Sequence, residues 1–365
     1  MKLTIIAGAR PNFMKIAPIV HAVQKAQKRG RDINYRLVHT GQHYDQKMSD
    51  TFFRELNIPE PDANLGCGGG TQAEQTAAVM VAFEKELTAH PADLVVVVGD
   101  VNSTMACSIV AKKLHTQVAH VEAGIRSGDI TMPEEINRIV TDAVADYFFT
   151  TTELAGDNLR KEGVQDDRIF LVGNVMIDTL SVNRHRFEKP DVWDKLNLKR
   201  GGYFVTTLHR PANVDGAEQL RSLMHEIVSG TRGLPVIFPM HPRTAKIFRE
   251  LDIAAPQLHI IEPLGYLQFN FLVERALAVI TDSGGITEET SVMGVPCITL
   301  RDNTERPETI TLGTNELIGT DPQAIQPALD KLFAGQWKKG SNIPLWDGRA
   351  AERIVEVMEK GLMRW

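Results

Sequence analysis

The stretch LVVVVGD at residues 94–100 decides the fold class of this chain. The run from Leu94 to Val98 is as long as a strand and holds no polar residue for a solvent-facing side. Such a strand is typical of a parallel sheet that helices cover on both faces. Gly99 and Asp100 follow it directly, so we expect them at the carboxyl edge of the sheet, where doubly wound folds bind ligands.

Short apolar runs continue to alternate with longer amphipathic stretches on both sides of this strand. In the first half the predicted strands are 3–7, 35–39, 94–98, 118–121 and 147–150, and the predicted helices are 18–29, 47–56, 72–88, 104–114 and 135–145. After a polar stretch the strands are 203–207, 236–238, 259–261, 278–281 and 297–300, and the helices are 217–229, 267–275 and 287–293. We therefore predict an α/β fold with two Rossmann-like domains, 1–174 and 175–348, and a terminal helix in 349–365.

Composition narrows the classes of function. The 365 residues are 43% apolar and 24% charged, and the net charge of -6 favours neither nucleic acid nor an anionic membrane as a partner. We expect no signal peptide and no membrane span, because the apolar runs are only as long as strands. Cys67, Cys107 and Cys297 are far apart and form no CxxC pair, which favours buried thiols in a reducing cytoplasm.

The candidate chemistry of the first half lies in loops after predicted strands. Arg10 and Lys15 flank a small-residue turn that can offer backbone N–H groups to a pyrophosphate, although an ordinary turn with two solvated cations fits as well. Asp100, Glu122 and Glu134 all fall on the same edge of the sheet. Helix capping explains Asp100 alone and the helix dipole explains Glu134 alone, but several carboxylates in one cleft supply acid and base roles.

In the second half, His209 follows a strand and suits a diphosphate or a proton shuttle, whereas His241 is as readily structural. The motif TDSGGITEE at 281–289 places two glycines at a strand-to-helix turn, where a phosphate can approach the backbone. Glu289, one turn into that helix, can accept both hydroxyls of a ribose, unless it is an exposed surface carboxylate. The charged loop DNTERPE at 302–308 is a further candidate contact or a solvated connection.

Several classes of site are not indicated. The chain has no HExxH, no cluster of Cys and His at metal-ligand spacing and no GxSxG elbow. Walker and GxGxxG patterns are also missing from the glycine-rich turn. We therefore expect neither a metal nor a cofactor.

Taken together, these motifs resemble the non-hydrolysing UDP-N-acetylglucosamine 2-epimerases. The resemblance runs over nearly the whole chain, and its matching segments are GARPNFMKIAP, TGQH, GDVNST, HVEAGIRSGD, PEEINR, GNVMIDTL, the HR of LHRPANVD, TDSGGITEE and TERPE. It implies a glycosyltransferase-B-like fold, with a terminal helix that crosses back to the first domain. It also implies anti elimination of UDP to a 2-acetamidoglucal, followed by re-addition without a nicotinamide cofactor.

The resemblance also implies roles for individual residues. Asp100, Glu122 and Glu134 look like the catalytic carboxylates, and His209 looks like the partner of the diphosphate. The positions that correspond to substrate ligands are Arg10, Lys15, Ser283, Gly284 and Gly285 for UDP, Glu289 for the ribose, Tyr266 and Phe269 around the uracil, and Arg306 in TERPE. A UDP-sugar is the implied partner, and a homodimer the implied assembly.

Three departures from the family pattern stand out. Asn12 replaces a glutamate that many members carry, and the loop at 130–132 before Glu134 is short. The glycine-rich stretch 65–71 replaces one in which substrate-regulated bacterial members carry an arginine. We therefore expect weak or no activation by substrate, although the other possible allosteric residues remain, namely Gln42, His43, Gln46 and His241.

Three alternative functions are compatible with a related nucleotide-sugar site. A glycosyltransferase shares the nucleotide half of the fold but has no need of three carboxylates in its first domain, so Asp100, Glu122 and Glu134 favour the epimerase. A hydrolysing epimerase differs only in whether water enters the site. A non-catalytic sensor would not keep every candidate acid, base and phosphate ligand. Among substrates, a UDP-2,3-diacetamido uronic acid is the alternative to UDP-N-acetylglucosamine.

Overall fold

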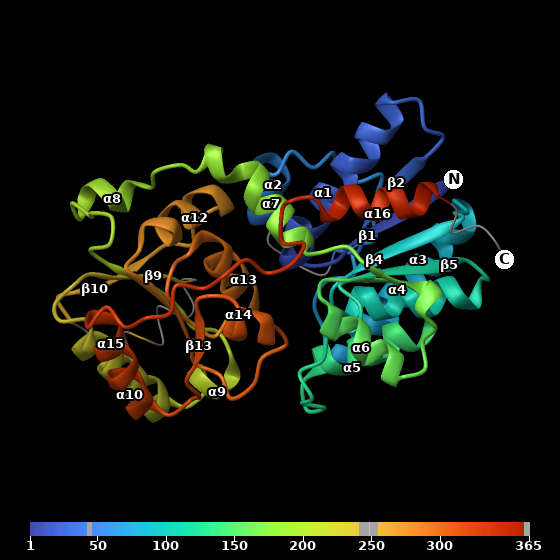
Figure 1. Cartoon of the computed structure of the whole chain (residues 1–365). Helices are drawn as coiled ribbons and strands as arrows, with labels where there is room; N and C mark the ends of the chain where they lie inside the picture. The colour runs from blue at the N-terminus through green and yellow to red at the C-terminus, as the bar shows by residue number, and fades with distance from the viewer. Residues whose placement is uncertain (42–45, 241–247, 249–254, 361–365) are drawn as a thin grey trace. The chain divides into compact units, whose positions relative to one another are not determined.

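The computed structural model describes residues 1–41, 46–240, 248 and 255–360, without the side chains of 10–11 and 46–50. The chain forms two compact units, residues 1–182 with 344–365, and residues 183–343 (Figure 1). The first unit ends later than the expected 174, because helix α7 (Val175–Asn183) is bonded into it. In α7, Thr179 Oγ1 donates to Met14 O at 2.5 Å, and Asp178 accepts from the backbone N–H groups of Ala350 and Ala351.

The first unit is built on a wholly parallel sheet with the order β3-β2-β1-β4-β5-β6-β7. The order reverses direction between β1 and β4, so the loops after these two strands form a topological switch point. Every predicted strand of this half is confirmed, and two short edge strands, β3 and β7, are added. The bounds are β1 Lys2–Ala7, β2 Asn34–His39, β3 Ala63–Asn64, β4 Leu94–Val98, β5 Gln117–Val121, β6 Tyr147–Thr150 and β7 Ile169–Leu171.

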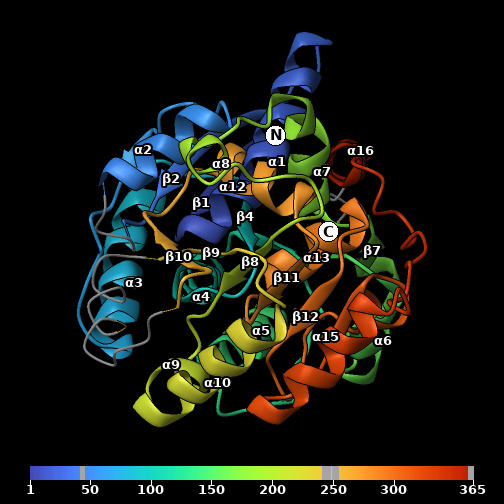
Figure 2. The same ribbon diagram turned by 90° about the vertical axis from the view of Figure 1, so that its left-hand side faces the viewer.

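Helices cover both faces of this sheet (Figures 1 and 2). The first begins at Arg10, whereas the sequence predicted a start at Pro18. Pro11 sits in the first turn, where no intrahelical N–H is needed, so the helix starts directly after the β1 loop and Pro18 lies inside it. The helices are α1 Arg10–Lys28, α2 Gln46–Glu55, α3 Gln72–Ala89, α4 Asn102–Lys113, α5 Pro133–Val144, α6 Glu153–Lys161, α7 and the terminal helix α16 Ala350–Glu359.

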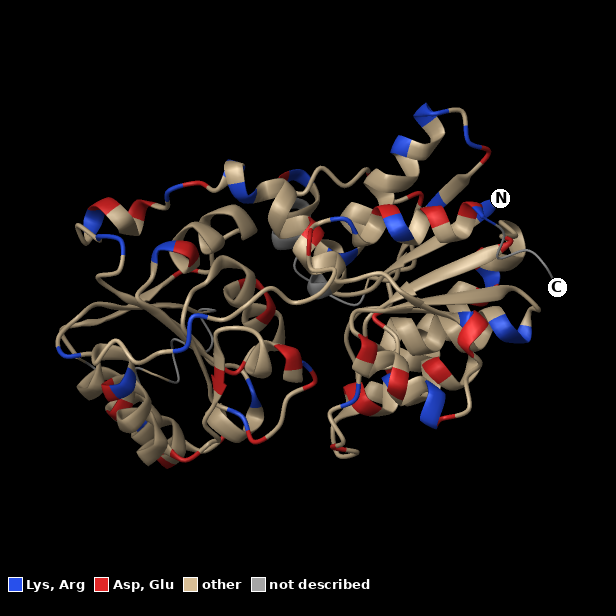
Figure 3. Ribbon diagram, viewed as in Figure 1, with Lys and Arg blue, Asp and Glu red and all other residues tan. Residues whose placement is uncertain are grey.

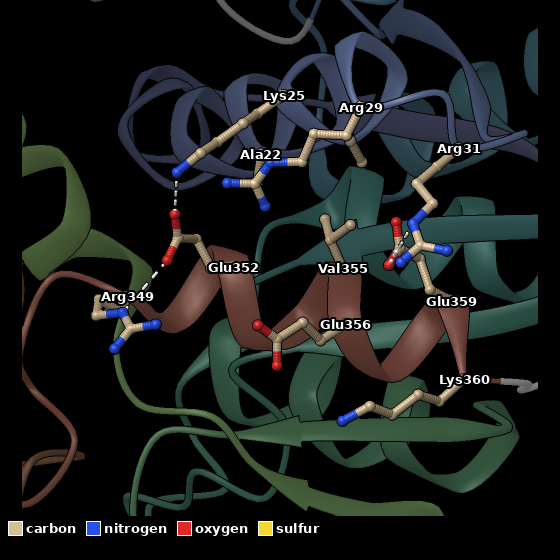
Figure 4. Close-up of a pocket in the computed structure, with 11 residues that line it drawn as sticks. Ala22, Lys25, Arg29, Arg31, Arg349, Glu352, Val355, Glu356, Glu359 and Lys360 are labelled. Atoms are coloured by element: carbon tan, nitrogen blue, oxygen red, sulfur yellow. Dashed lines mark hydrogen bonds and ion pairs between the residues drawn. The ribbon is translucent and has the colours of Figure 1, made fainter.

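The terminal helix α16 packs along α1 within the first unit. A groove of about 620 Å³ runs between the two helices (Figure 4). Glu352 pairs there with both Lys25 and Arg349. Arg31 Nε lies 3.7 Å from Glu359 Oε2. Two of these ion pairs, Lys25 with Glu352 and Arg31 with Glu359, therefore link the α1 side of the groove to α16.

The second unit repeats the plan with a parallel sheet in the order β10-β9-β8-β11-β12-β13, and its switch point lies between β8 and β11. All predicted strands of this half are confirmed. The strands are β8 Phe204–Thr207, β9 Val236–Pro239, β10 Leu258–Ile261, β11 Ala278–Thr281, β12 Cys297–Thr299 and β13 Asn315–Leu317. The helices are α8 Asp191–Lys195, α9 Pro211–Val214, α10 Ala217–Gly230, α12 Tyr266–Arg275, α13 Gly284–Met293, α14 Pro307–Thr311 and α15 Ile325–Phe333.

The strand period explains why both faces of the second sheet are apolar. Successive side chains point to opposite faces. Phe204 and Ile280 join the core under α10 and α15, whereas Val205 and Val279 join a second core that includes residues of α12. Charged residues lie mainly on the helices and loops, and the strands of both sheets are almost free of them (Figure 3). In the described part of the chain, no helix combines the length and apolarity needed to cross a membrane.

Candidate active site

Asn12 joins the two loops at the switch point of the first unit. Its Oδ1 accepts from Ala9 N at 3.0 Å and its Nδ2 donates to Val98 O at 2.8 Å. The side chain thus fixes the turn after β1 against the end of β4. Gly99 follows at φ +69, a conformation that favours glycine, and a Cβ there would lie 3.0 Å from Lys15 Nζ. The loop after β4 therefore passes directly beside the lysine.

Glu122 lies at the end of β5, next to that lysine. Its Oε2 is 2.5 Å from Lys15 Nζ, and only 2% of its side chain is exposed. The residue has φ +70, in the left-handed region, which costs a non-glycine residue on the order of 1 kcal/mol. Hydrogen bonds from Glu122 N and Ala123 N to Phe149 O hold this backbone in place. A strained, buried carboxylate at a strand end is typical of functional sites.

Asp100 is bound by Arg138, the last residue of the PEEINR segment, to which no role was assigned from the sequence. Arg138 Nη1 lies 2.5 Å from Asp100 Oδ2, and the arginine side chain is 3% exposed. Arg138 also bonds Glu135, which accepts from Ser127 N and Gly128 N. Burial raises the pKa of Glu135, but these hydrogen bonds outweigh it and the pKa is lowered. Glu135 is thus a structural carboxylate that fixes Arg138. The spacing of three residues between Glu135 and Arg138 in PEEINR, which suits an ion pair on one helix face, was the available signal in the sequence.

Glu134, its neighbour in the first turn of α5, differs from Glu135 in its contacts. The residue is half-buried, and its side chain forms no hydrogen bond or ion pair with any residue that the structure describes. The first unit therefore holds three predicted carboxylates in three environments. One pairs with a lysine, one with an arginine, and one has no cationic partner in the described part of the chain.

A buried hydrogen-bond network holds the loops after β4 and β5 in place. His120 is fully buried, with its Nε2 2.8 Å from Gly99 O and its Nδ1 2.6 Å from Asp142 Oδ1. Asp142 also accepts from Gly124 N and from Arg126. Burial raises the pKa of Asp142, but His120 and Arg126 outweigh it and the pKa is lowered. The sequence alone did not reveal this hydrogen-bond network, because Asp142 lies on α5, far along the chain from His120.

In the second unit, His209 meets an aspartate of the neighbouring loop. His209 follows β8, Asp282 follows β11, and His209 Nδ1 lies 2.7 Å from Asp282 Oδ1. The side chain of Asp282 is fully buried, whereas that of His209 is 57% exposed. Burial raises the pKa of Asp282, but the hydrogen bonds from His209, Arg210 N and Asn213 outweigh it and the pKa is lowered. An ionised aspartate thus anchors one side of an otherwise open imidazole.

The predicted phosphate turn forms the N-terminus of α13. Ser283 is the N-cap, and Gly284 and Gly285 open the helix. N–H groups in a first helical turn have no intrahelical acceptor, so they remain available to an anion. A Cβ on Gly284 would lie 3.8 Å from both Arg301 Nη1 and Glu305 Oε2. Arg301 donates to both oxygens of Glu305, which places a balanced ion pair beside the turn.

Glu289 is buried, so it is not the exposed surface carboxylate that the sequence left open. Tyr266 Oη donates to its Oε1 at 2.7 Å, and Asn270 Nδ2 lies 3.4 Å away. Burial raises the pKa of Glu289 to about 7, against the hydrogen bond from Tyr266 and with help from the negative charge of Glu288. Tyr266, expected around the uracil, is thus itself buried against Glu289. Phe269 packs at the edge of the neighbouring core.

Other expected site residues have different surroundings. Arg306 is buried and its guanidinium pairs with Glu288. Arg10 and Gln46 lie in helices, but their side chains are outside the described residues, as are Gln42, His43 and His241 altogether. Among the residues that the structure describes, no three His, Cys, Asp or Glu side chains gather in a group that could hold a metal ion.

Each of the two parallel sheets carries ionisable side chains in the loops at its switch point. This arrangement defines an α/β enzyme of the glycosyltransferase-B-like class. The family model described as UDP-N-acetylglucosamine 2-epimerase matches residues 25–359. A UDP-N-acetylglucosamine 2-epimerase of Methanocaldococcus jannaschii is 41% identical, over 99% of this chain and 100% of the relative. The chain therefore belongs to the UDP-N-acetylglucosamine 2-epimerase family, whose members are isomerases.

Solved structures agree with this assignment. The Methanocaldococcus jannaschii enzyme in complex with UDP-GlcNAc and UDP matches with a TM-score of 0.88 over 99% of this chain and 100% of that chain. A Neisseria meningitidis UDP-GlcNAc 2-epimerase bound to UDP-GlcNAc is 29% identical, with a TM-score of 0.89 over 99% of this chain and 100% of that chain. The fold class and family expected from the motifs are thus confirmed.

Proposed function

We propose that this chain interconverts UDP-N-acetylglucosamine and UDP-N-acetylmannosamine. The observation that carries the proposal is the placement of Asp100 and Glu122 at the ends of neighbouring strands, where Val98 and Val121 are register partners. Carboxylates at adjacent strand ends suit proton transfer at one sugar carbon. The name of the Methanocaldococcus jannaschii relative and the UDP-GlcNAc bound to its solved structure support the choice of substrate.

The chemistry follows from the weak acidity of the C2 proton. A base alone removes it too slowly, so cleavage of the C1–O bond runs ahead and UDP leaves with the electron pair. The carboxylates stabilise the positive charge that builds at C1, and one of them takes the C2 proton as the C1–C2 double bond forms. Return of a proton on the opposite face and re-addition of UDP at C1 complete the inversion.

The ion pairs indicate how the carboxylates divide these tasks. Asp100 pairs with Arg138 and Glu122 pairs with Lys15, and we propose that these two carboxylates stabilise the charge at C1 and that one of them takes the C2 proton. Glu134 has no cationic partner among the described residues, and we propose that it returns the proton on the other face. The open side of His209 and the N-terminus of α13 are proposed to bind the diphosphate, and Glu289 the ribose.

A direct test is to incubate the enzyme with UDP-N-acetylglucosamine in deuterated water and to follow the sugar by proton NMR. The proposal expects UDP-N-acetylmannosamine to appear, with deuterium at C2 of both sugars. Free N-acetylmannosamine with UDP would indicate hydrolysis instead. Exchange without epimerisation, or no reaction, would reject the proposed activity.

A second substrate has its own support. A Pseudomonas aeruginosa relative named UDP-2,3-diacetamido-2,3-dideoxy-D-glucuronate 2-epimerase is 37% identical over 99% of this chain and 100% of its own length. The same assay with that uronic acid decides between the two. Turnover of the uronic acid alone would change the substrate and leave the elimination route in place.

A further inference from the structure

We propose that Asp282 is a positioning residue, which fixes the ring of His209 so that Nε2 presents a proton to the diphosphate of the UDP-sugar. The inference rests on the proposed function, because it takes the diphosphate as the ligand of His209. The side chain of Asp282 is fully buried behind His209, so the proposal gives it no direct contact with the substrate. It acts through the histidine.

The two residues meet because their strands are neighbours. Thr207 at the end of β8 and Thr281 at the end of β11 are register partners, and their hydroxyls lie 2.6 Å apart. The loops that follow start side by side, which brings His209 Nδ1 to 2.7 Å from Asp282 Oδ1. One nitrogen of the ring is thus anchored against the core, while more than half of the side chain stays exposed.

The chemistry of the pair determines which nitrogen faces the ligand. An ionised carboxylate only accepts hydrogen bonds, so Nδ1 must carry the hydrogen that binds Asp282. A diphosphate oxygen also only accepts, and the ring can bind it only through an Nε2–H. The bound ring is therefore an imidazolium held between two anions, with Asp282 on one side and the diphosphate on the other.

Asp282 also shapes the backbone, so a test must separate two effects. Its oxygens accept from His209 N at 3.0 Å, from Arg210 N at 2.9 Å and from Asn213 Nδ2 at 3.1 Å. Asn213 offers a matched control, because Asn213→Ser removes one donor to the same carboxylate and leaves the imidazole contact intact. A merely structural Asp282 would make Asp282→Asn and Asn213→Ser behave alike.

The first measurement is nitrogen NMR of histidine-labelled protein without ligand, with the His209 signals assigned by their loss in His209→Asn. At a pH where the ring is neutral, we expect the Nδ1–H form in the wild type and in Asn213→Ser, and the Nε2–H form in Asp282→Asn. An Nε2–H ring in the wild type would overturn the proposal. This arm needs no variant of Asp282 to fold.

The second measurement is a double-mutant cycle on UDP affinity, by calorimetry. Asp282→Asn should weaken UDP binding about 10-fold or more in the wild-type background, the usual scale for one misaligned charge-assisted hydrogen bond. In the His209→Asn background the same change should have little effect, because the residue through which Asp282 acts is gone. Equal losses in both backgrounds would overturn the proposal.

These tests separate the inference from the proposed function. UDP titration and NMR report on Asp282 even if the wild-type enzyme fails to epimerise UDP-N-acetylglucosamine. In that case the proposed activity is rejected, while the NMR and UDP-binding results still decide whether Asp282 positions His209. Epimerisation by the wild type together with an additive cycle would support the proposed activity and overturn the positioning role of Asp282.

Discussion

Replacement of Glu289 by glutamine should stabilise the free enzyme at alkaline pH. The carboxyl group is fully buried, and its pKa rises from 4.5 to about 7 on folding. An acid whose pKa is raised by folding stabilises the native state while it is neutral, and this contribution is lost as the pH rises through the folded value. The change from 4.5 to about 7 corresponds to about 3 kcal/mol at pH 8, at about 1.4 kcal/mol for each pH unit.

Glutamine keeps the shape and the acceptor oxygen that Tyr266 and Asn270 bond, but it carries no charge to bury. We therefore expect Glu289→Gln to exceed the wild type in stability by up to about 3 kcal/mol at pH 8, with the gap much smaller at pH 5. Scanning calorimetry of both proteins at several pH values, without UDP, measures the gap. UDP must be absent, because ligand binding would add its own stabilisation.

The exposed carboxylate of Glu218 in the first turn of α10 provides the control. Glu218→Gln should show no comparable pH-dependent gain. A Glu289→Gln protein that is no more stable than the wild type at pH 8, or whose gain is equal at pH 5, would refute the reasoning. The proposed ribose contact adds an opposite effect, since the stabilised variant should bind UDP more weakly.

Four further outcomes are expected. Asp100→Asn, Glu122→Gln and Glu134→Gln should each lower kcat by roughly 100-fold or more while UDP affinity is largely kept; one variant with wild-type kcat would exclude that residue from the mechanism. Arg138→Lys keeps the charge but cannot bridge Asp100 and Glu135 together, so kcat should fall with little change in KM. Activity should survive EDTA and dialysis, and restoration by a divalent ion would contradict this. Saturation with UDP-N-acetylglucosamine should be hyperbolic, whereas strong sigmoidicity would show a second binding site.

Much of the site was readable from the sequence because it follows strands. Buried parallel strands have a strong apolar signal, and their carboxyl ends place the next residues at one edge of the sheet. Asp100, Glu122, His209 and Glu289 were identified in this way, and the structure puts the first three at strand ends. The predicted start of α1 at Pro18 was wrong, because the helix begins at Arg10, about two turns earlier. A proline in the first turn of a helix and a proline inside a helix look alike in the local sequence.

The contacts between side chains in and around the site were decided only by the tertiary structure. Arg138 for Asp100, Asp142 for His120 and Asp282 for His209 come from other elements, and which side chains meet depends on strand order and helix packing. Burial is also a tertiary property, and it raises the pKa of Glu289 to about 7 although the residue lies on a helix with no apolar stripe to predict it. The sequence thus determined the kinds of chemical groups and the edge of the sheet where they lie. The folded chain determined their charge, because a carboxylate responds to the cations, dipoles and solvent around it.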